Sequence, residues 1–263
     1  MPIIGQASPS ILTAALLLMS AGVVNAVEPS ANGPKIIFHL PLDGNLRAAM
    51  AGGRAEPVLS PQRTDFVPGK KGQAVKLWNK PAWSLTYDTT KNLNLSAGTI
   101  AFWISPQPGQ DKKLRTVFST GKEKNLNLIR LSYVSPEKGK NSSFQGYFMA
   151  KRLRPTQFQI GSWNNAAEKD WKIGDWHHVM LVWNDLRGVA LFFDGQPVTG
   201  PPTNNGAFVF MDVALSMSLG PALVALDEFI ILDGPVSPAS FAKMTNTEYD
   251  QKPAESIEYK YVH

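Results

Sequence analysis

Short runs of β-branched and aromatic residues, bounded by Gly, Pro, Asn and Asp, recur along this sequence, and no helical periodicity persists before its C-terminal part. This punctuation is typical of antiparallel strands joined by tight turns. The 263 residues include 21 Gly and 20 Pro, so turns are frequent, while 7 Trp and 13 Phe supply apolar area for a core. The pattern predicts an all-β fold, a two-sheet antiparallel sandwich in a single domain.

The run Trp176 to Trp183 has the clearest strand pattern. Val179, Leu181 and Trp183 alternate along the strand with His178, Met180 and Val182. Because successive side chains of a strand point to opposite faces, both faces of this strand are expected to be buried, as in a central strand.

Two local signals define turns and the one helix. Asp194-Gly195 supplies the positive φ values of a tight hairpin turn, and a three-strand meander is expected around it. Ser237-Pro238 predicts an N-cap and a first helical position, opening a short helix that ends near Met244. The predicted strands cover 36–40, 74–78, 99–104, 116–119, 126–133, 144–150, 157–160, 177–183, 189–193, 213–219 and 227–232.

The first 26 residues resemble an export signal. An apolar run at 11–24 is followed by Val24-Asn25-Ala26, where small residues suit a signal peptidase. We predict cleavage after Ala26, export to the periplasm or the extracellular space of a bacterium, and no membrane span in the mature chain. The lack of Cys agrees with this assignment and excludes disulfides and thiolate metal sites. The domain is predicted at 33–245, and 246–263 as a polar, loosely attached tail.

Charge is distributed unevenly along the chain. Residues 1–109 carry a net charge of +4, residues 110–154 carry +8 and residues 155–263 carry −7, which sum to the overall +5. A basic block in an exported protein predicts an acidic polysaccharide as partner, and not a nucleic acid. The alternative is that these Lys and Arg residues protect loops and edge strands from aggregation.

Six phrases in the chain together resemble one superfamily. They are FHLPLDGN, FVPGKKGQAVKL, LNLSAGTIAFWISP, DWHHVMLVWND, LFFDGQPV and ALDEFIILDGPVSPASF, within residues 36–244. Their order and spacing resemble the laminin-G-like, concanavalin A-like lectin/glucanase jelly rolls of exported bacterial proteins. The resemblance implies two antiparallel sheets packed as a curved sandwich, with a glycan site on the concave face or on rim loops. It leaves activity open, because this sandwich hosts lectins, hydrolases, lyases and adhesion modules.

Aromatic residues near predicted loops are the candidates for sugar stacking, since sugar rings present apolar C–H faces to indole and phenol rings. Trp103, Trp176 and Trp183 lie within strand patterns and are assigned to the core. The function predicted is non-catalytic carbohydrate binding, and the alternative from another class is a structural or adhesive module without a small ligand. The candidate ligand-binding residues are Trp78, Trp83, Tyr87, Arg130, Lys151 and Trp163.

Two enzymatic alternatives to binding make specific demands on the sequence. Glucanases on this sandwich use a Glu-x-Asp-x-Glu spacing, which the chain lacks. A polysaccharide lyase needs a Tyr or His base and a cation for the uronate carboxylate, and Tyr147, Arg130 and His178 supply those residue types. His177 and His178 are adjacent in a strand, point to opposite faces and are therefore expected to be structural residues.

A structural calcium ion is the cofactor prediction. Calcium takes six to eight oxygen ligands from carboxylates, amides and carbonyls. Asp43 and Asn45, near the first strand, are expected to meet Asp227, near the last one. The resemblance supports this pairing, because related sandwiches often connect their first and last strands through an ion, although the second Asp of the family phrase is absent here.

Overall fold

The computed structural model describes residues 33–78, 83–108, 115–120, 128–134, 143–149, 171–184, 187–198 and 216–259, with only the backbone described at 143–149. These residues belong to one compact unit that begins at Gly33. The leader at 1–26 and the predicted strand at 157–160 lie outside the described residues.

Within the described residues, the larger sheet contains nine strands, and every pairing in it is antiparallel. Its main path runs β12-β11-β10-β6-β14-β1-β2, and β4 pairs with both β14 and β3. The strands are β1 (Ile36–Leu40), β2 (Met50–Ala51), β3 (Asp65–Pro68), β4 (Gln73–Lys76), β6 (Ala97–Pro106), β10 (His177–Asn184), β11 (Gly188–Phe193), β12 (Gln196–Pro197) and β14 (Val224–Leu232).

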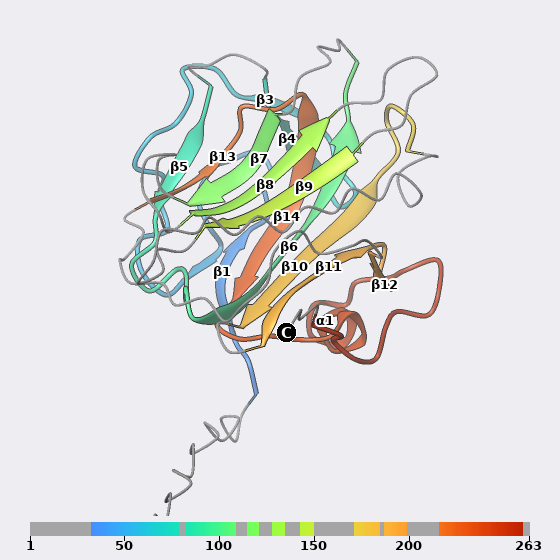
Figure 1. The fold of residues 1–263 in the computed structure, drawn as a ribbon. Helices are drawn as coiled ribbons and strands as arrows, with labels where there is room; N and C mark the ends of the chain where they lie inside the picture. The colour runs from blue at the N-terminus through green and yellow to red at the C-terminus, as the bar shows by residue number, and fades with distance from the viewer. Residues whose placement is uncertain are drawn as a thin grey trace, which may run out of the picture. The chain divides into compact units, whose positions relative to one another are not determined.

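In the part of the chain that the structure describes, the smaller sheet contains five strands in the order β5-β13-β7-β8-β9. It faces the larger sheet in Figure 1, so the predicted two-sheet antiparallel sandwich is confirmed. Its strands are β5 (Leu85–Asp88), β13 (Ser216–Leu219), β7 (Arg115–Thr120), β8 (Leu128–Val134) and β9 (Ser143–Met149).

The predicted hairpin at Asp194-Gly195 is present. The two residues have φ values of 50° and 77°, and Phe193 pairs with Gln196 directly across the turn. Together with the β10–β11 pairing this makes the expected three-strand meander. Because β10 lies between β6 and β11, it is an interior strand, as its two apolar faces predict.

Alternating side chains of the central strands build the core between the sheets. Phe102 of β6 and Val179, Leu181 and Trp183 of β10 join the core cluster, which also takes Phe118 and other residues of the smaller sheet. Trp183 is fully buried and donates from Nε1 to the carbonyl oxygen of Leu95 at 2.9 Å. Burial on this scale contributes about 1.5–3 kcal/mol for each large apolar side chain.

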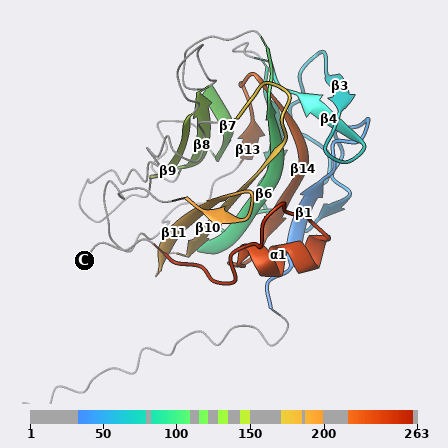
Figure 2. The same ribbon diagram turned by 90° about the vertical axis from the view of Figure 1, so that its right-hand side faces the viewer.

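A second apolar layer lies on the outer face of the larger sheet. It contains Met180 and Val182 of β10 and Phe241 of α1 (Pro238–Thr245), the short helix that Ser237 caps as predicted. Figure 2 shows α1 on the side of the larger sheet away from the smaller one. In the described part of the chain, no helix has the length and apolar character needed to cross a bilayer.

Residues 246–259, the described part of the segment after α1, are not loosely attached, which corrects for these residues the expectation of a loose polar tail at 246–263. The Ala254 N–H donates to Gly195 O at 2.9 Å, and Gln196 Nε2 donates to Lys252 O at 2.8 Å. Ala254, Ile257 and Tyr259 also pack against the outer apolar layer. The tail therefore covers a sheet face that would otherwise expose apolar side chains to water.

Candidate functional site

Two of the predicted ligand-binding residues line one pocket. Trp78 follows β4, and Trp83 precedes β5. The pocket has a volume of about 600 Å³, within the range of small-molecule sites. Its remaining lining comes from the loop before β3 and from the first residue of β3: Leu59, Ser60, Pro61, Gln62, Arg63 and Asp65. This Trp78–Trp83 pocket combines aromatic, cationic and amide groups.

Polar contacts fix the orientation of the Trp78 indole. Its Nε1 donates to Asp65 Oδ2 at 2.9 Å, and the Lys76 ammonium lies 4.4 Å from the ring centroid, over one face. Arg63 Nε donates to the other Asp65 oxygen at 2.9 Å. This hydrogen bond holds the pKa of the Asp65 carboxyl below its usual value, so the group is ionised at neutral pH. A half-buried indole held this way is preorganised for stacking.

Trp83 forms the deeper wall of the pocket. Only 6% of this residue is exposed, and it belongs to the core cluster between the sheets. Gly220 makes the close packing possible, because a Cβ at that position would lie 3.0 Å from Trp83 Cε3, and its φ of 83° also favours glycine.

Tyr87 lies in the core and not with the two tryptophans, so the stacking role predicted for it is wrong. It is 2% exposed, its hydroxyl donates to Leu46 O at 2.5 Å, and its ring packs edge-on against Phe38 at 5.1 Å. Tyr87 and Leu85 are two residues apart in β5, so their side chains lie on the same face of the strand, and this face is buried. Trp163 and Lys151, also predicted to bind ligand, lie outside the described residues.

The three residues of the lyase hypothesis are not brought together. Arg130 of β8 and Tyr147 of β9 are directly opposite in the backbone register. His178, however, lies in the larger sheet, where it contacts the outer layer through Phe241 and Tyr249. Arg130 alternates with Ile129 and Leu131, which face the core, so the core separates Arg130 from His178.

His177 and His178 point to opposite faces of β10, as expected for neighbours in a strand. His177 stacks on Trp171 with ring centroids 4.0 Å apart, and its Nδ1 lies 2.8 Å from Asp194 Oδ2. His178 is 2% exposed, and its Nδ1 lies 3.0 Å from the Tyr249 hydroxyl. Burial lowers the pKa of His178 to about 3, so this imidazole is neutral over the physiological range.

Two expected core tryptophans lie elsewhere. Trp103 is 9% exposed and Trp176 is half-buried, and both line hollows on the outer face of the larger sheet instead of the core between the sheets. Of the three tryptophans assigned to that core, Trp183 alone lies in it.

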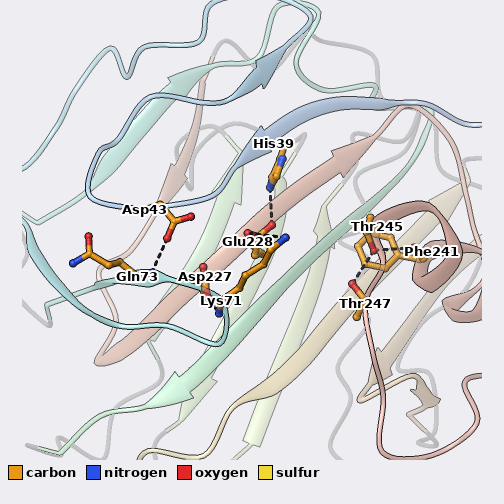
Figure 3. A network of polar contacts seen from close by, with 9 residues as sticks. All are labelled: His39, Asp43, Lys71, Gln73, Asp227, Glu228, Phe241, Thr245 and Thr247. Carbon is orange, nitrogen blue, oxygen red and sulfur yellow. Dashed lines mark hydrogen bonds and ion pairs between the residues drawn. The ribbon is translucent and has the colours of Figure 1, made fainter.

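Asp43 and Asp227 hold the β3–β4 turn from two sides, and we call this arrangement the clasp (Figure 3). Asp43 Oδ1 accepts from the Gln73 N–H at 2.6 Å, and Asp227 Oδ2 accepts from the Lys71 N–H at 2.8 Å. Glycine is required between them, because a Cβ at Gly72 would lie 2.2 Å from Asp43 Oδ1. The clasp therefore joins the segment after β1 to β14 through a hairpin turn.

A β-bulge in β14 positions the charged side chain of Glu228 beside the clasp. The register with β6 shifts between Asp227 and Ile230, and Glu228 takes the left-handed conformation with φ of 50°. Glu228 Oε2 lies 2.7 Å from His39 Nε2, and Glu228 Oε1 lies 3.8 Å from Lys71 Nζ. Burial raises the pKa of Asp227 to about 7, and the nearby Glu228 adds to this effect.

The calcium prediction fits two of its three residues. Asp227 Oδ1 is buried and has no hydrogen-bond partner, so a cation at the clasp would satisfy it. Asn45 does not fit, because its Oδ1 accepts from the Arg47 N–H at 2.9 Å and its Nδ2 donates to Asp43 O at 3.2 Å. Across the described ranges, no group of three or more acidic or His side chains is arranged to hold a metal. Calcium at Asp43 and Asp227 stays a prediction.

Comparison with known proteins defines the fold. No protein-family model matches the chain, and no curated protein matches its sequence. One similar solved structure is domain 4 of AbnA, a GH43 extracellular arabinanase from Geobacillus stearothermophilus, in complex with arabinotriose. It matches with a TM-score of 0.57 and 16% identity, over 80% of this chain and 98% of that one.

Two toxin structures match as well. The binding domain of Paraclostridial Mosquitocidal Protein 1 has a TM-score of 0.57 and 16% identity over 80% of this chain and 51% of that one. Botulinum neurotoxin type C, which depends on two ganglioside molecules to enter cells, has a TM-score of 0.57 and 12% identity over 81% and 51%. This chain spans about half the length of these toxin chains. At such identities the likeness shows the β-sandwich fold alone.

The neutral, buried His178 predicts a loss of stability in acid. The unfolded chain binds a proton at the ordinary His pKa of about 6.5, whereas the folded protein does so near 3, so stability falls as pH drops between these values. Urea unfolding from pH 7 to pH 4 should show that His178→Gln removes part of this dependence, by at most about 1.4 kcal/mol per pH unit. Tyr249→Phe should keep it, because burial is the main cause. An unchanged slope in His178→Gln would contradict this account.

Calcium at the clasp predicts a metal-dependent melting temperature. An ion that binds only the folded state stabilises it, and the stabilisation grows with the logarithm of the ion concentration above Kd, so millimolar calcium should raise Tm and a chelator should lower it. Asp43→Asn should lose the calcium response, while Asp88→Asn should retain it, because Asp88 lies at the end of β5, outside the clasp. If the wild type has the same Tm with calcium and with chelator, the prediction of a stabilising calcium ion is wrong.

Proposed function

We propose that this protein is an exported, non-catalytic carbohydrate-binding domain of the laminin-G-like, concanavalin A-like jelly-roll superfamily, and that it binds acidic polysaccharide in the Trp78–Trp83 pocket. The observation that carries the proposal is the arrangement of two indoles and a guanidinium around one pocket of about 600 Å³. An aromatic wall stacks on the apolar face of a sugar ring, and polar neighbours bind its hydroxyl groups.

The cations around Trp78 favour an anionic sugar. The Arg63 side chain is 86% exposed and uses only its Nε for Asp65 within the described structure, which leaves the Nη groups for a ligand carboxylate. Lys76 adds a second positive charge at the Trp78 ring. Asp65 is the one carboxylate in the lining, and its oxygens already accept from Arg63 and Trp78. The pocket therefore offers an excess of positive charge next to an aromatic platform.

The basic block of the sequence supports the same ligand class. Of its eleven Lys and Arg residues, only Arg115 and Arg130 lie within the described residues, and both are on the smaller sheet. A net charge of +8 over residues 110–154 attracts a polyanion at long range, which raises the association rate at low ionic strength.

The similar structures support carbohydrate binding in general terms. The arabinanase domain was solved with arabinotriose, and the type C neurotoxin uses ganglioside molecules. Both are sandwiches like this one, and the arabinanase is extracellular, which agrees with export through the segment at 1–26. The lyase alternative has less support, because Arg130 and His178 lie on the outer faces of different sheets. The remaining alternative is a structural or adhesive role without a small ligand, and binding experiments distinguish it from carbohydrate binding.

Variants of the pocket should weaken binding of an acidic oligosaccharide. For trigalacturonate measured by isothermal titration calorimetry, Trp78→Ala should lower affinity about tenfold or more, because the stacking area is lost. Arg63→Ala should lower affinity and also reduce its dependence on salt concentration.

Arg47→Ala is the matched control, since Arg47 is also exposed and also pairs with a carboxylate, that of Glu56 at 3.3 Å. It should leave trigalacturonate affinity unchanged. Equal losses in Arg63→Ala and Arg47→Ala would indicate only general charge attraction. No effect of Trp78→Ala would exclude this pocket as the site.

A further inference from the structure

Two hollows adjoin each other on the outer face of the larger sheet, away from the Trp78–Trp83 pocket. Their volumes are about 300 and about 380 Å³. The lining residues that they share are Lys70, Trp103, Glu248, Tyr249 and Asp250. The β3–β4 turn and the segment after α1 therefore enclose one bipartite groove over the sheet, and we call it the outer groove.

The floor of the outer groove is aromatic and rigidly packed. The Trp103 ring packs edge-on against His178 at 5.0 Å, and the Tyr249 ring packs edge-on against the same imidazole at 5.3 Å. The Tyr249 hydroxyl is 3.0 Å from His178 Nδ1, which fixes both rings. Trp176 lies half-buried at one end of the groove. Such a floor offers ring faces that need little reorganisation on binding.

The walls of the outer groove carry polar groups that the protein itself leaves unused. Lys70 holds its ammonium 4.5 Å from the Trp103 centroid, where the two hollows meet. Glu248 and Asp250 face the groove from the tail. Within the described residues, none of these three side chains forms a hydrogen bond or an ion pair. Carboxylates accept from sugar hydroxyls, and an ammonium donates to them.

We propose that the outer groove is a second saccharide site, which takes a neutral sugar. Trp176 provides the stacking face, Glu248 and Asp250 accept hydrogen bonds from hydroxyl groups, and Lys70 donates one. The two carboxylates repel a uronate, so the selectivity is opposite to that of the Trp78–Trp83 pocket. The groove shares no lining residue with that pocket, and its occupancy does not depend on the function proposed there.

One hairpin connects the two sites. Asp65 and Lys76 pair at the open end of β3–β4, beside Trp78, and Lys70 lies in its turn, at the outer groove. The four-residue strands between them span roughly 13 Å. Two sites of opposite charge preference on one rigid unit allow a domain to hold an acidic and a neutral chain together, with avidity for a mixed surface.

Isothermal titration with arabinotriose, cellotriose, mannotriose and trigalacturonate tests the outer groove. We expect at least one neutral trisaccharide to bind the wild-type protein. Trp176→Ala and the double variant Glu248→Gln/Asp250→Asn should each weaken that binding about tenfold or more. The double variant changes only exposed side chains, so it tests the site even if Trp176→Ala impairs folding.

Two controls separate this groove from the first pocket. Glu255→Gln removes an exposed carboxylate of the same segment, which pairs with Lys252, and should leave neutral-sugar affinity unchanged. Trp78→Ala should weaken trigalacturonate binding and leave neutral-sugar binding intact. The proposal is overturned if no neutral trisaccharide binds, if the double variant binds as the wild type does, or if Trp78→Ala removes neutral-sugar binding.

Discussion

The pairing of the last strand with the first at the centre of the larger sheet is the constraint on which the other features depend. β14 lies between β6 and β1 and also pairs with β4, so it joins parts of the chain far apart in sequence. Eight of its nine residues are buried. At its bulge, Asp227 and Glu228 turn toward the β3–β4 hairpin and hold Lys71 by its amide and its ammonium. The position of this hairpin follows from β14.

Both candidate saccharide sites then follow from the position of the hairpin. Its open end carries Asp65 and Lys76, which orient the Trp78 indole, and its turn carries Lys70, which lies over Trp103. A hairpin that was free to move would leave neither indole in a fixed environment. The clasp therefore links the stability of the sandwich to the geometry of its surface, since fixed side chains lose less entropy on binding.

Much of the fold could be predicted from periodicity. Strands with clear alternation, the Asp194-Gly195 turn and the Ser237 cap are as expected, because local chemistry determines them. The sequence patterns do not predict β2, β3 and β5, because two to four residues give no recognisable alternation and pairing with neighbouring strands holds them in place. The polar composition of the tail predicts loose attachment and is misleading, because Tyr249, Ala254, Ile257 and Tyr259 are spaced apolar anchors within it.

The sites were less accessible to sequence reasoning. Trp78 and Trp83 stood out as loop aromatics, but Arg63 and Asp65 become their neighbours only through the β3–β4 pairing. The stacking role expected of Tyr87 is wrong because packing decides which side of its strand faces the core. The core position expected of Trp103 is wrong because a distant segment covers the outer face of the sheet. Only the tertiary fold brings Lys70, Trp103 and Glu248 to one groove.

Stacking of an acidic saccharide in the Trp78–Trp83 pocket is the core of the proposed function. The most direct measurement follows the indole N–H resonances of the 7 tryptophans by NMR while trigalacturonate is added to the protein without its leader. We expect the Trp78 and Trp83 resonances, assigned from Trp78→Phe and Trp83→Phe, to shift with the ligand while the Trp183 resonance stays in place. Saturating ligand that shifts other indoles and leaves both of these unchanged would contradict it.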